Sequence, residues 1–524
     1  MTSNRTDEGA QTASARPPAR APSRSLGNPE VLLLLSLVGA MLLLRLATLG
    51  SYPLMDTSEA RYGEIARVML VTGNWVTPQE VPGTPFWAKP PLYAWFAVAS
   101  MKVLGVNEFA LRLPSFFCAL LVLALCVGWS NSLGGVRSPN ERTRAALLTL
   151  GILSTSVLFF VSAGAVMTDP TLAVCTTWML AAFHHCAIRA SRVAIWRWGF
   201  FVAAGLGMLA KGPVILLYVG APIALWTLWQ RRFAGVWHAL PWFWGAVLTA
   251  AICVPWYWLA EERTPGFLRY FLLGEHVMRF LKPGWGGDLY GTAHAEPLGM
   301  IWAYLAGALG LGVVLVVAAA LGAAREFLGG IARNIDAEHR FLLLASLVPI
   351  LFFTFAGNVI WTYVLPTLPP LAVLVAGFLA ARWDRSLRWR AAVYGTLGAS
   401  GLCVAIAIIA WVPRHVAKHS SAALAAQWRE RAGPVQGEIA YLGRKAPASL
   451  RFYSAGSVRT VTTLAEAMPA SHGAHDWYVA LAPDRVGEVR QFANTQPGVW
   501  SVETIGANTD LALVRVHPGA LSAP

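Results

Sequence analysis

The sequence contains few charged residues for its length. Lys, Arg, Asp and Glu make up 13% of its 524 residues, which is half of the share of about 25% in a soluble globular domain. Hydrophobic residues reach 56%, and the mean hydropathy is +0.52. This scarcity of charge excludes a soluble enzyme of several domains, and it is typical of a membrane protein.

Cysteine is also scarce, and its positions form no functional pattern. All six cysteines lie in apolar runs: Cys118, Cys126, Cys175, Cys186, Cys253 and Cys403. Their spacings match neither a metal site nor a disulfide framework.

Acidic residues are outnumbered, since 27 Asp and Glu stand against 41 Lys and Arg and the net charge is +14. In a soluble protein this excess would indicate nucleic acid. In a membrane protein it reflects orientation signals and binding of anionic lipids. We therefore expect membrane lipids, and no nucleic acid, among the partners.

Apolar stretches long enough to cross about 30 Å of hydrocarbon recur along the chain. Eleven spans are predicted: 31–49, 109–129, 145–163, 171–188, 196–209, 213–230, 238–259, 298–322, 340–356, 360–380 and 391–412. Residues 1–29 are polar and rich in Pro, Ser and Arg, so we expect a disordered cytoplasmic tail. A tail of this length favours a retained signal anchor over a cleaved signal peptide.

Arginine-rich loops alternate with loops that hold few basic residues. After the tail, the basic loops lie within 137–144, 189–197, 231–232, 325–340 and 382–390, whereas the short loops between them hold only Lys211. The positive-inside rule then puts the N-terminus in the cytoplasm. An odd number of spans puts the C-terminus outside, so we expect a multi-pass protein of the bacterial inner membrane with a periplasmic C-terminus.

These spans divide the chain into a transmembrane domain (30–412), with outer loops at 50–108 and 260–297, and a polar segment, 413–524. In the polar segment, β-type runs are predicted at 438–442, 450–453, 477–481, 500–505 and 511–516, with helices at 422–432 and 484–494. The predicted fold is therefore an α-helical polytopic membrane protein with about 11 or more transmembrane helices and a small C-terminal α/β extracytoplasmic domain.

The first outer loop combines acids with a helical pattern. Ile65, Val68, Met69 and Leu70 recur at helical spacing, which predicts an amphipathic helix at the membrane interface. Its acids are either catalytic or part of a surface helix, for which Asp56 or Ser58 would be the cap.

Lys89 lies in the same loop, between aromatic residues and two prolines. Its ammonium group is either a partner for a lipid phosphate or a side chain that reaches to the membrane surface without further function.

Several longer motifs occur in a fixed order: EARYGEIARVMLVTGNWVTP, PFWAKPPLYAW, LGVNEFALRLPS, MTDPTLA, GEHVMRFL and TYVLPTLPPLAVL. Over residues 45–380 the chain resembles the integral-membrane glycosyltransferases with the C-type fold, in particular the aminoarabinose lipid A transferases and more distantly the protein O-mannosyltransferases. The resemblance implies an outer-facing cavity. There, a sugar would pass from a polyprenyl (undecaprenyl) phosphate carrier, with inversion, to lipid A or another envelope glycan or protein.

The resemblance also implies catalytic acids. The family pattern Asp-Glu-x-Arg-Tyr is similar to residues 58–62, which read Ser-Glu-Ala-Arg-Tyr. The role of the family aspartate therefore falls either to Asp56 or to Glu59, of which we favour Asp56. Asp169, in Thr-Asp-Pro, matches the second acid of the family, although it is also a candidate helix cap.

The residues implied to bind substrate or phosphate are Arg61, Tyr62, Lys89, Lys211, His276, Arg279 and Tyr363. The family lysine near the last of these is replaced by Val359, so Lys211 or Arg61 is expected to compensate. In the mechanism, cations stabilise the departing phosphate, and a carboxylate takes the proton of an acceptor hydroxyl. No base is needed if the acceptor is a phosphate.

A divalent metal is part of the family picture, held by a glutamate together with the histidine that matches His276. Here Ala88 replaces the glutamate, which removes a ligand. We therefore predict no tightly bound catalytic metal and no other cofactor, and His276, the only weak metal candidate, would instead make a hydrogen bond.

Other functions compete with this one: a transporter or flippase of lipid-linked sugars, a protein O-glycosyltransferase, or a membrane scaffold. A transporter would show inverted repeats and charges near the membrane midplane, whereas here the charges gather in the outer loops.

Overall fold

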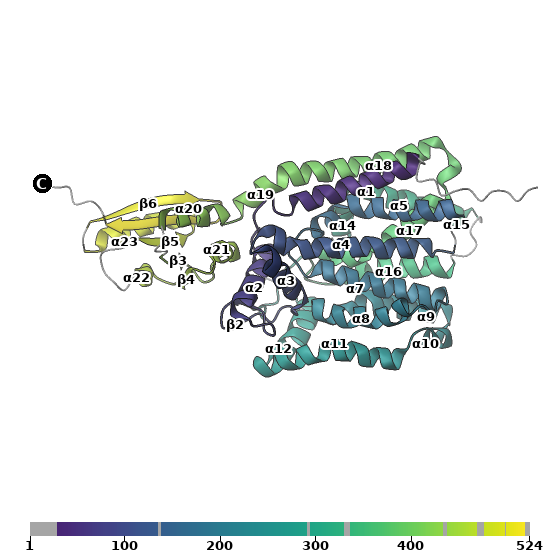
Figure 1. Ribbon diagram of the computed structural model, residues 1–524, viewed down its shortest axis with the longest axis horizontal. Coiled ribbons are helices and arrows are strands. Elements are labelled where there is room, and N and C mark those ends of the chain that lie inside the picture. Colours follow the sequence, from purple (N-terminus) through teal and green to yellow (C-terminus); the bar gives the residue numbers. More distant parts are fainter. Residues whose placement is uncertain are drawn as a thin grey trace, which may run out of the picture.

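The computed structural model describes residues 29–134, 138–290, 294–329, 336–432, 437–468, 476–497 and 499–518. A long helical bundle occupies one part of the molecule, and a small sheet domain projects from one end of it (Figure 1). The predicted tail lies outside the described residues up to position 28.

The bundle consists mainly of long apolar helices. They are α1 (Pro29–Thr48), α4 (Glu108–Asn131), α5 (Pro139–Thr155), α6 (Val157–Ser162), α7 (Asp169–Phe183), α8 (Ala194–Lys211), α9 (Ala221–Gln230), α10 (Phe233–Ala239), α11 (Trp242–Arg263), α14 (Met300–Leu309), α15 (Val313–Leu328), α16 (Ala337–Phe353), α17 (Leu368–Ala381), α18 (Leu387–Ile406) and α19 (Val412–Lys418). In the described chain, seven helical segments are long and apolar enough to cross a membrane. The chain is therefore a helical multi-pass membrane protein, as predicted.

The number of eleven spans stays a prediction. A helix overlaps each predicted span, but several of these helices are short or interrupted. The span predicted at 145–163, for example, is broken at Ser156, which has extended backbone between α5 and α6.

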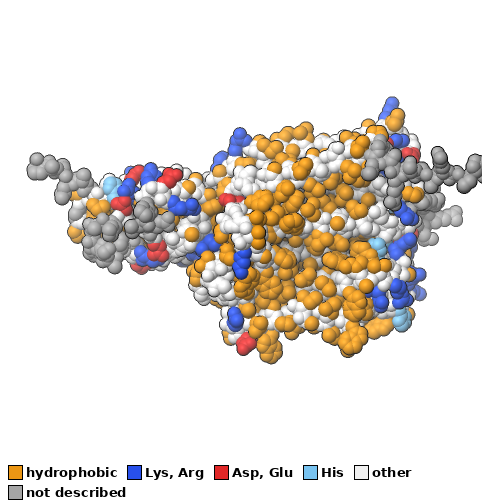
Figure 2. Space-filling model, in the orientation of Figure 1, with side chains coloured by type: hydrophobic (Ala, Val, Ile, Leu, Met, Phe, Trp, Pro, Cys, Tyr) orange, Lys and Arg blue, Asp and Glu red, His pale blue; other side chains and the backbone are white. Residues whose placement is uncertain are grey.

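The helices differ in how much of their surface other helices cover. α7 and α17 lie inside the bundle and bury most of their side chains, whereas α1, α11, α15 and α18 leave apolar side chains uncovered. Figure 2 shows these apolar side chains over the middle of the bundle, with Lys and Arg gathered at the end far from the sheet domain. Such an apolar belt is expected of a surface that faces lipid.

Outer segments cover the end of the bundle next to the sheet domain. The first contains α2 (Ser58–Thr72), a hairpin of β1 (Gln79–Val81) and β2 (Thr84–Pro85), and α3 (Leu92–Leu104). The second contains α12 (Phe267–Arg269), the π-helical η3 (Tyr270–Met278) and α13 (Arg279–Leu281).

Helix α2 is the predicted amphipathic helix, and it buries Ile65, Val68 and Met69. The predicted cap is wrong, because the helix begins after Thr57 without a side-chain cap bond. The helix ends at Gly73, whose φ of 68° is accessible to glycine at little cost.

The C-terminal domain is α/β, as predicted. Its five strands are β3 (Ile439–Leu442), β4 (Val458–Val461), β5 (Trp477–Leu481), β6 (Trp500–Ala507) and β7 (Ala512–Pro518), in the order β4-β3-β5-β7-β6. β3 pairs in parallel with β4 and β5, whereas β7 pairs antiparallel with β5 and β6. Its helices are α20 (Ala422–Ala432), α21 (Ala448–Tyr453), α22 (Leu464–Ala467) and α23 (Val486–Thr495).

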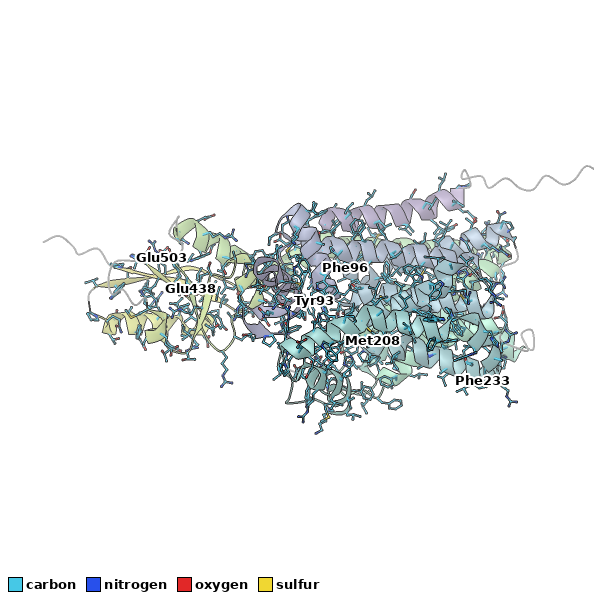
Figure 3. All side chains as sticks on the ribbon, turned by 60° about the horizontal axis from the view of Figure 1, so that its bottom comes forward. Tyr93, Phe96, Met208, Phe233, Glu438 and Glu503 are labelled. Carbon is cyan, nitrogen blue, oxygen red and sulfur yellow. The ribbon has the colours of Figure 1, made fainter. Side chains whose placement is uncertain are left out.

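The strand predicted at 450–453 is wrong, since these residues belong to helix α21. A short apolar run does not distinguish strand from helix, and packing decides here. Phe452 belongs to the apolar cluster that α2 and α3 form, whereas Leu450 packs in the domain's own core. Helix α21 thus joins the domain to the bundle, at the end where Tyr93 is labelled in Figure 3.

Candidate active site

Two cations from distant segments meet at one carboxylate. Lys89 follows β2, Arg279 begins α13, and both contact the same oxygen, Oε2 of Glu275, with Lys89 Nζ and Arg279 Nη1 each at 3.0 Å. The hydroxyl group of Tyr270 donates to the other oxygen, Oε1, at 3.1 Å. The Glu275 side chain is only 3% exposed, so this cluster is shielded from bulk solvent.

The ionisation of Glu275 follows from these neighbours. Burial by itself would raise the pKa of the carboxyl group, but the charges of Lys89 and Arg279 outweigh burial and hold the pKa at about 2. Glu275 is therefore an anion at neutral pH, held between two cations as the phosphate of a ligand would be.

Contacts between the two outer segments hold these cations in place. Tyr290 Oη accepts from the amide of Trp87 at 2.9 Å and donates to the carbonyl of Pro85 at 3.0 Å. On the other side, the amide nitrogen of Asn358 donates to the carbonyl groups of Arg279 and Lys282, and its oxygen accepts from the amide of Gly284. Hydrogen bonds to backbone groups thus fix the segments that carry both cations.

A second ion pair joins Lys211, at the end of α8, to Asp169, at the start of α7. Lys211 Nζ lies 2.5 Å from Oδ1 of Asp169, and both residues are buried. The same ammonium group lies 4.8 Å from the ring centroid of Tyr363, a distance at which a cation is attracted to an aromatic face.

His276 contacts the backbone on both sides of its ring. Nδ1 lies 2.7 Å from the carbonyl oxygen of Phe271, and Nε2 lies 3.3 Å from that of Lys211. Gly212 lets the rings of Phe271 and His276 pack against the backbone at this point, since a Cβ there would lie 2.4 Å from the Phe271 ring and 3.3 Å from the His276 ring. Burial lowers the pKa of His276, although the two carbonyl groups oppose this effect.

Tyr62, on α2, lies near both ion pairs. Burial raises its pKa to about 12; the charge of Asp169 adds to this effect, while Lys211 and Arg61 oppose it. Arg61 extends toward the β1–β2 hairpin, where its Nε lies 3.7 Å from Glu80. Eight predicted site residues thus lie at this end of the bundle: Arg61, Tyr62, Lys89, Asp169, Lys211, His276, Arg279 and Tyr363.

Glu59 makes a different contact. Both of its oxygens accept from Arg112 of α4, at 2.8 and 2.9 Å, and the Arg112 side chain is fully buried. Arg112 also donates to the carbonyl groups of Leu49, Tyr52 and Pro53. Although burial opposes it, the charge of Arg112 lowers the pKa of Glu59. The pair therefore ties α2 to α4.

Asp56 faces the C-terminal domain. One carboxylate oxygen accepts from the amide of Ser449 at 3.0 Å, and the other accepts from the hydroxyl group of Ser449. Burial raises the pKa of Asp56 despite these bonds. The contacts of Asp56 thus lead to α21 and not to the Lys89 or Lys211 cluster.

The residues around His276 do not fit a divalent metal ion. Within the described ranges, no three His, Cys, Asp or Glu side chains are grouped so that they could hold one. Ala88 is buried beside Lys89, and both His276 nitrogens face carbonyl oxygens. That the protein holds no catalytic metal stays a prediction.

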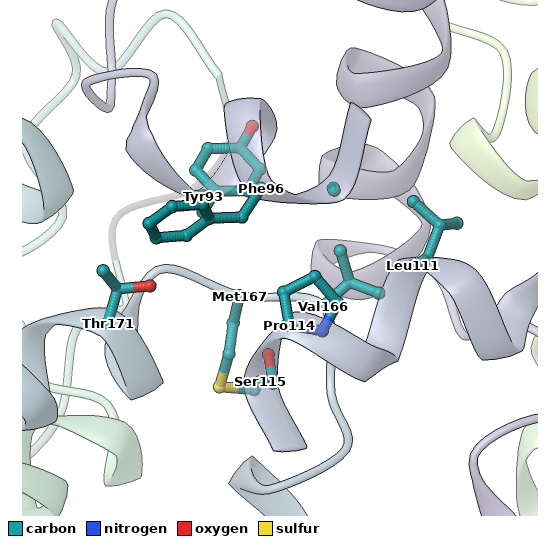
Figure 4. A pocket seen from close by; sticks show the side chains of 9 residues that line it. Tyr93, Phe96, Leu111, Pro114, Ser115, Val166, Met167 and Thr171 are labelled. Atoms are coloured by element: carbon teal, nitrogen blue, oxygen red, sulfur yellow. The ribbon is translucent and has the colours of Figure 1, made fainter. Parts of the chain in front are cut away.

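A small pocket of about 10 Å³ lies beside this region, between α3, α4 and the start of α7. Its lining is mainly apolar and includes Tyr93, Phe96 and Met167 (Figure 4). This volume is enough for about one water molecule, so the pocket is too small for a sugar.

Three residues of the site region were not among the predicted site residues: Glu275, Asn358 and Arg112. Glu275 lies next to His276 and four residues before Arg279, a spacing that brings two side chains together on a helix. That spacing was a usable signal. Asn358 and Arg112 gave none, because their partners are backbone carbonyl groups or distant in sequence.

Comparison with known proteins agrees with this architecture. Residues 31–271 match the model of the family described as dolichyl-phosphate-mannose-protein mannosyltransferase. Two undecaprenyl phosphate-alpha-4-amino-4-deoxy-L-arabinose arabinosyl transferases, from Erwinia tasmaniensis and Pseudomonas savastanoi pv. phaseolicola, are each 30% identical to the chain. The matches cover 68% and 71% of this chain but only 62% and 66% of the relatives.

A solved structure shares the fold. The crystal structure of ArnT from Cupriavidus metallidurans bound to undecaprenyl phosphate superposes with a TM-score of 0.71 at 19% identity, over 94% of this chain and 99% of that one.

Proposed function

We propose that this chain, a member of the ArnT-like branch of the integral-membrane glycosyltransferases with the C-type fold, transfers a sugar to lipid A. The sugar would come from an undecaprenyl phosphate carrier. One observation carries the proposal: Lys89 and Arg279 converge within 3.0 Å of one oxygen of Glu275. A pair of partly buried cations at this spacing is suited to a phosphate group.

The cations act on the leaving group. When the bond between the anomeric carbon and the phosphate oxygen breaks, its electron pair stays on the phosphate. Lys89 and Arg279 lie where they would stabilise that charge, and they are already oriented by the Tyr290 and Asn358 contacts. Donors positioned in advance, in a site shielded from water, stabilise developing charge strongly.

The acceptor oxygen attacks the anomeric carbon from the opposite side, which inverts its configuration. For an acceptor hydroxyl, Asp169 takes the proton, because it is buried beside Lys211 and close to Tyr62 and is not tied to another domain as Asp56 is. One of its oxygens is bound to Lys211, and the other is left for the proton. For an acceptor phosphate no proton has to leave, and Asp169 then stabilises positive charge on the sugar ring.

Glu59 and Asp56 have supporting roles in this proposal. Glu59 is neutralised by Arg112 and holds α2 in place. Asp56 links α2 to Ser449 of the C-terminal domain. Of the three acids expected to be catalytic, the proposal retains Asp169.

The site faces the periplasm in this proposal. Lys and Arg gather at the opposite end of the bundle (Figure 2), and basic loops favour the cytoplasmic side. The protein would then lie in the bacterial inner membrane with residues 413–524 in the periplasm. The outward grouping of charge also favours transfer over transport of lipid-linked sugars.

Mass spectrometry of lipid A tests the function. Cells that lack the gene would be complemented with the wild-type protein, with Lys89→Ala, or with Lys102→Ala. Lys102 is an exposed lysine on α3 that packs over Trp75, so it is a matched control. We expect an added sugar on lipid A with the wild type and with Lys102→Ala, but not with Lys89→Ala.

A lipid A mass that is the same in all strains would refute lipid A as the acceptor. A sugar that appears instead on a protein would favour the protein O-glycosyltransferase alternative.

A further inference from the structure

A second cavity, of about 390 Å³, lies where the C-terminal domain meets α2. Its walls come from α2, the β1–β2 hairpin, α21 and the segment from Ala455 to β4. Among the described residues that line it, none belongs to the Lys89–Glu275–Arg279 or Asp169–Lys211 clusters. Its volume falls within the range of about 300 to 1,000 Å³ that is usual for small-molecule sites.

Arg451 lines this cavity with most of its donors unused. The residue is 9% exposed, and its Nε and Nη1 atoms are buried without a hydrogen-bond partner. Nη2 reaches only Thr460 Oγ1, at 3.4 Å, which is long for a hydrogen bond. Because an unpaired buried charge is costly, a ligand that accepts from this guanidinium group is expected.

The carboxylates of the cavity do not fill that role, because other cations already neutralise them. Both oxygens of Glu64 accept from Arg67, each at 2.7 Å. Glu80 lies 2.8 Å from Lys445 and 3.7 Å from Arg61. With their ion-pair partners and Arg451 counted, the cations of this region exceed its carboxylates by two, so the cavity favours an anion.

We propose that this cavity binds a phosphate group carried by a sugar or a lipid headgroup, with Arg451 as its main ligand. Arginine binds phosphate through two parallel hydrogen bonds, and a phosphate monoester carries about two negative charges near pH 7, which matches the surplus. Gly456 leaves room for Arg67 at the wall, since a Cβ there would lie 2.7 Å from Nη2 of Arg67.

Such a ligand would connect two parts of the protein. Arg451 belongs to the C-terminal domain, whereas Arg67 belongs to α2, the helix that also holds Arg61 and Tyr62. Occupancy of the cavity would hold the domain against α2. The inference does not depend on the transfer reaction, because the site lies outside the two clusters described above.

Amide hydrogen exchange of the full chain in phosphatidylcholine nanodiscs tests the proposal. The probes are inorganic phosphate, glucosamine 1-phosphate and, in a third arm, lipid A added to the nanodisc. With a probe at about ten times its dissociation constant, we expect about tenfold slower exchange of amides in 448–461 and 79–83. Protection by inorganic phosphate identifies a soluble source, and protection by lipid A alone identifies a lipid headgroup.

Four variants locate the effect. Arg451→Gln should abolish the protection, and Arg451→Lys should restore part of it. Arg459→Gln should retain it, since Arg459 lies on the adjacent strand β4 but is exposed and paired with Glu438. Lys89→Ala should also retain it, which separates this site from the phosphate site of the proposed function.

The proposal would be overturned by no protection of the wild type by any of the three probes, or by equal protection in Arg451→Gln. Protection by a polyglutamate peptide but not by any phosphate probe would also overturn it, in favour of an acidic protein partner. Melting temperatures show whether the variants fold. If a variant does not fold, the absence of protection in the wild-type protein would still refute the proposal.

Discussion

Replacing Lys89 by alanine removes one of the two cations that contact Glu275 Oε2. If Lys89 stabilises the departing phosphate, turnover should fall by about 10²- to 10³-fold, the loss expected for one positioned donor and equivalent to about 3–4 kcal/mol. The binding of the donor should weaken less, because the charge on the leaving oxygen grows only as the bond breaks.

The structure separates this effect from a loss of stability. The lowering of the Glu275 pKa from 4.5 to about 2 corresponds to about 3 kcal/mol, at about 1.4 kcal/mol for each pKa unit. Several groups share this energy, among them Arg279 and Tyr270. Arg279 remains in the Lys89→Ala protein, so Glu275 stays ionised at pH 7, and we expect only a small change in melting temperature.

The assay is sugar transfer in proteoliposomes with an undecaprenyl phosphate-linked donor, with kcat and KM measured for four proteins: wild type, Lys89→Ala, Glu275→Gln and the double variant. If Glu275 acts by positioning Lys89, the double variant should be no slower than Lys89→Ala alone. The Lys102→Ala protein is the control for loss of a lysine near the membrane surface.

Near-normal turnover of Lys89→Ala at a normal protein level would refute the phosphate role of Lys89. A loss of turnover that parallels a loss of melting temperature in both single variants would give Lys89 a structural role only.

Four further predictions follow from the same contacts. Arg112→Leu leaves Glu59 buried without its partner and should cost about 3–5 kcal/mol of stability, measured by thermal unfolding; an unchanged melting temperature would contradict the structural role of the pair. Because the folded pKa of Glu275 is depressed, its carboxylate contributes stability above pH 4.5 that is lost as the pH falls toward 2. Glu275 therefore does not titrate between about pH 5 and about pH 8, and the pH–rate profile in that range should have no rise or fall that disappears in Glu275→Gln. Activity should survive exhaustive chelation, and restoration of a lost activity by one divalent ion would show that a carboxylate has joined His276 as a ligand. A reporter that works only in the periplasm should be active when it is fused after residue 420. Activity of a cytoplasmic reporter fused at the same position would reverse the proposed orientation.

Local patterns in the sequence were sufficient for much of the fold. The apolar runs predicted the membrane helices because burial in hydrocarbon requires about 20 apolar residues in a row. The repeat of Ile65, Val68 and Met69 predicted α2 because residues three and four apart share one face of a helix. Residues 450–453 were mistaken for a strand, since in so short a run the choice depends on what the segment packs against.

Much of the candidate site was also predictable, because its residues occur in ordered motifs. Lys89, Asp169, Lys211, Arg279 and Tyr363 were all expected from the sequence, and the structure brings them to one end of the bundle. The motifs identify residues that perform chemistry, but they do not say which of them contact one another.

Tertiary structure alone decided the partners of the acids. Glu275 lies 186 residues from Lys89, and Glu59 lies 53 residues from Arg112, so neither pair follows from spacing along the chain. Asp56 was favoured for the role of the family aspartate, yet its contacts lead to Ser449 in another domain. The physical reason is that helix formation depends on neighbours within a few residues, whereas a buried charge takes whichever partner the packing of distant segments brings within reach.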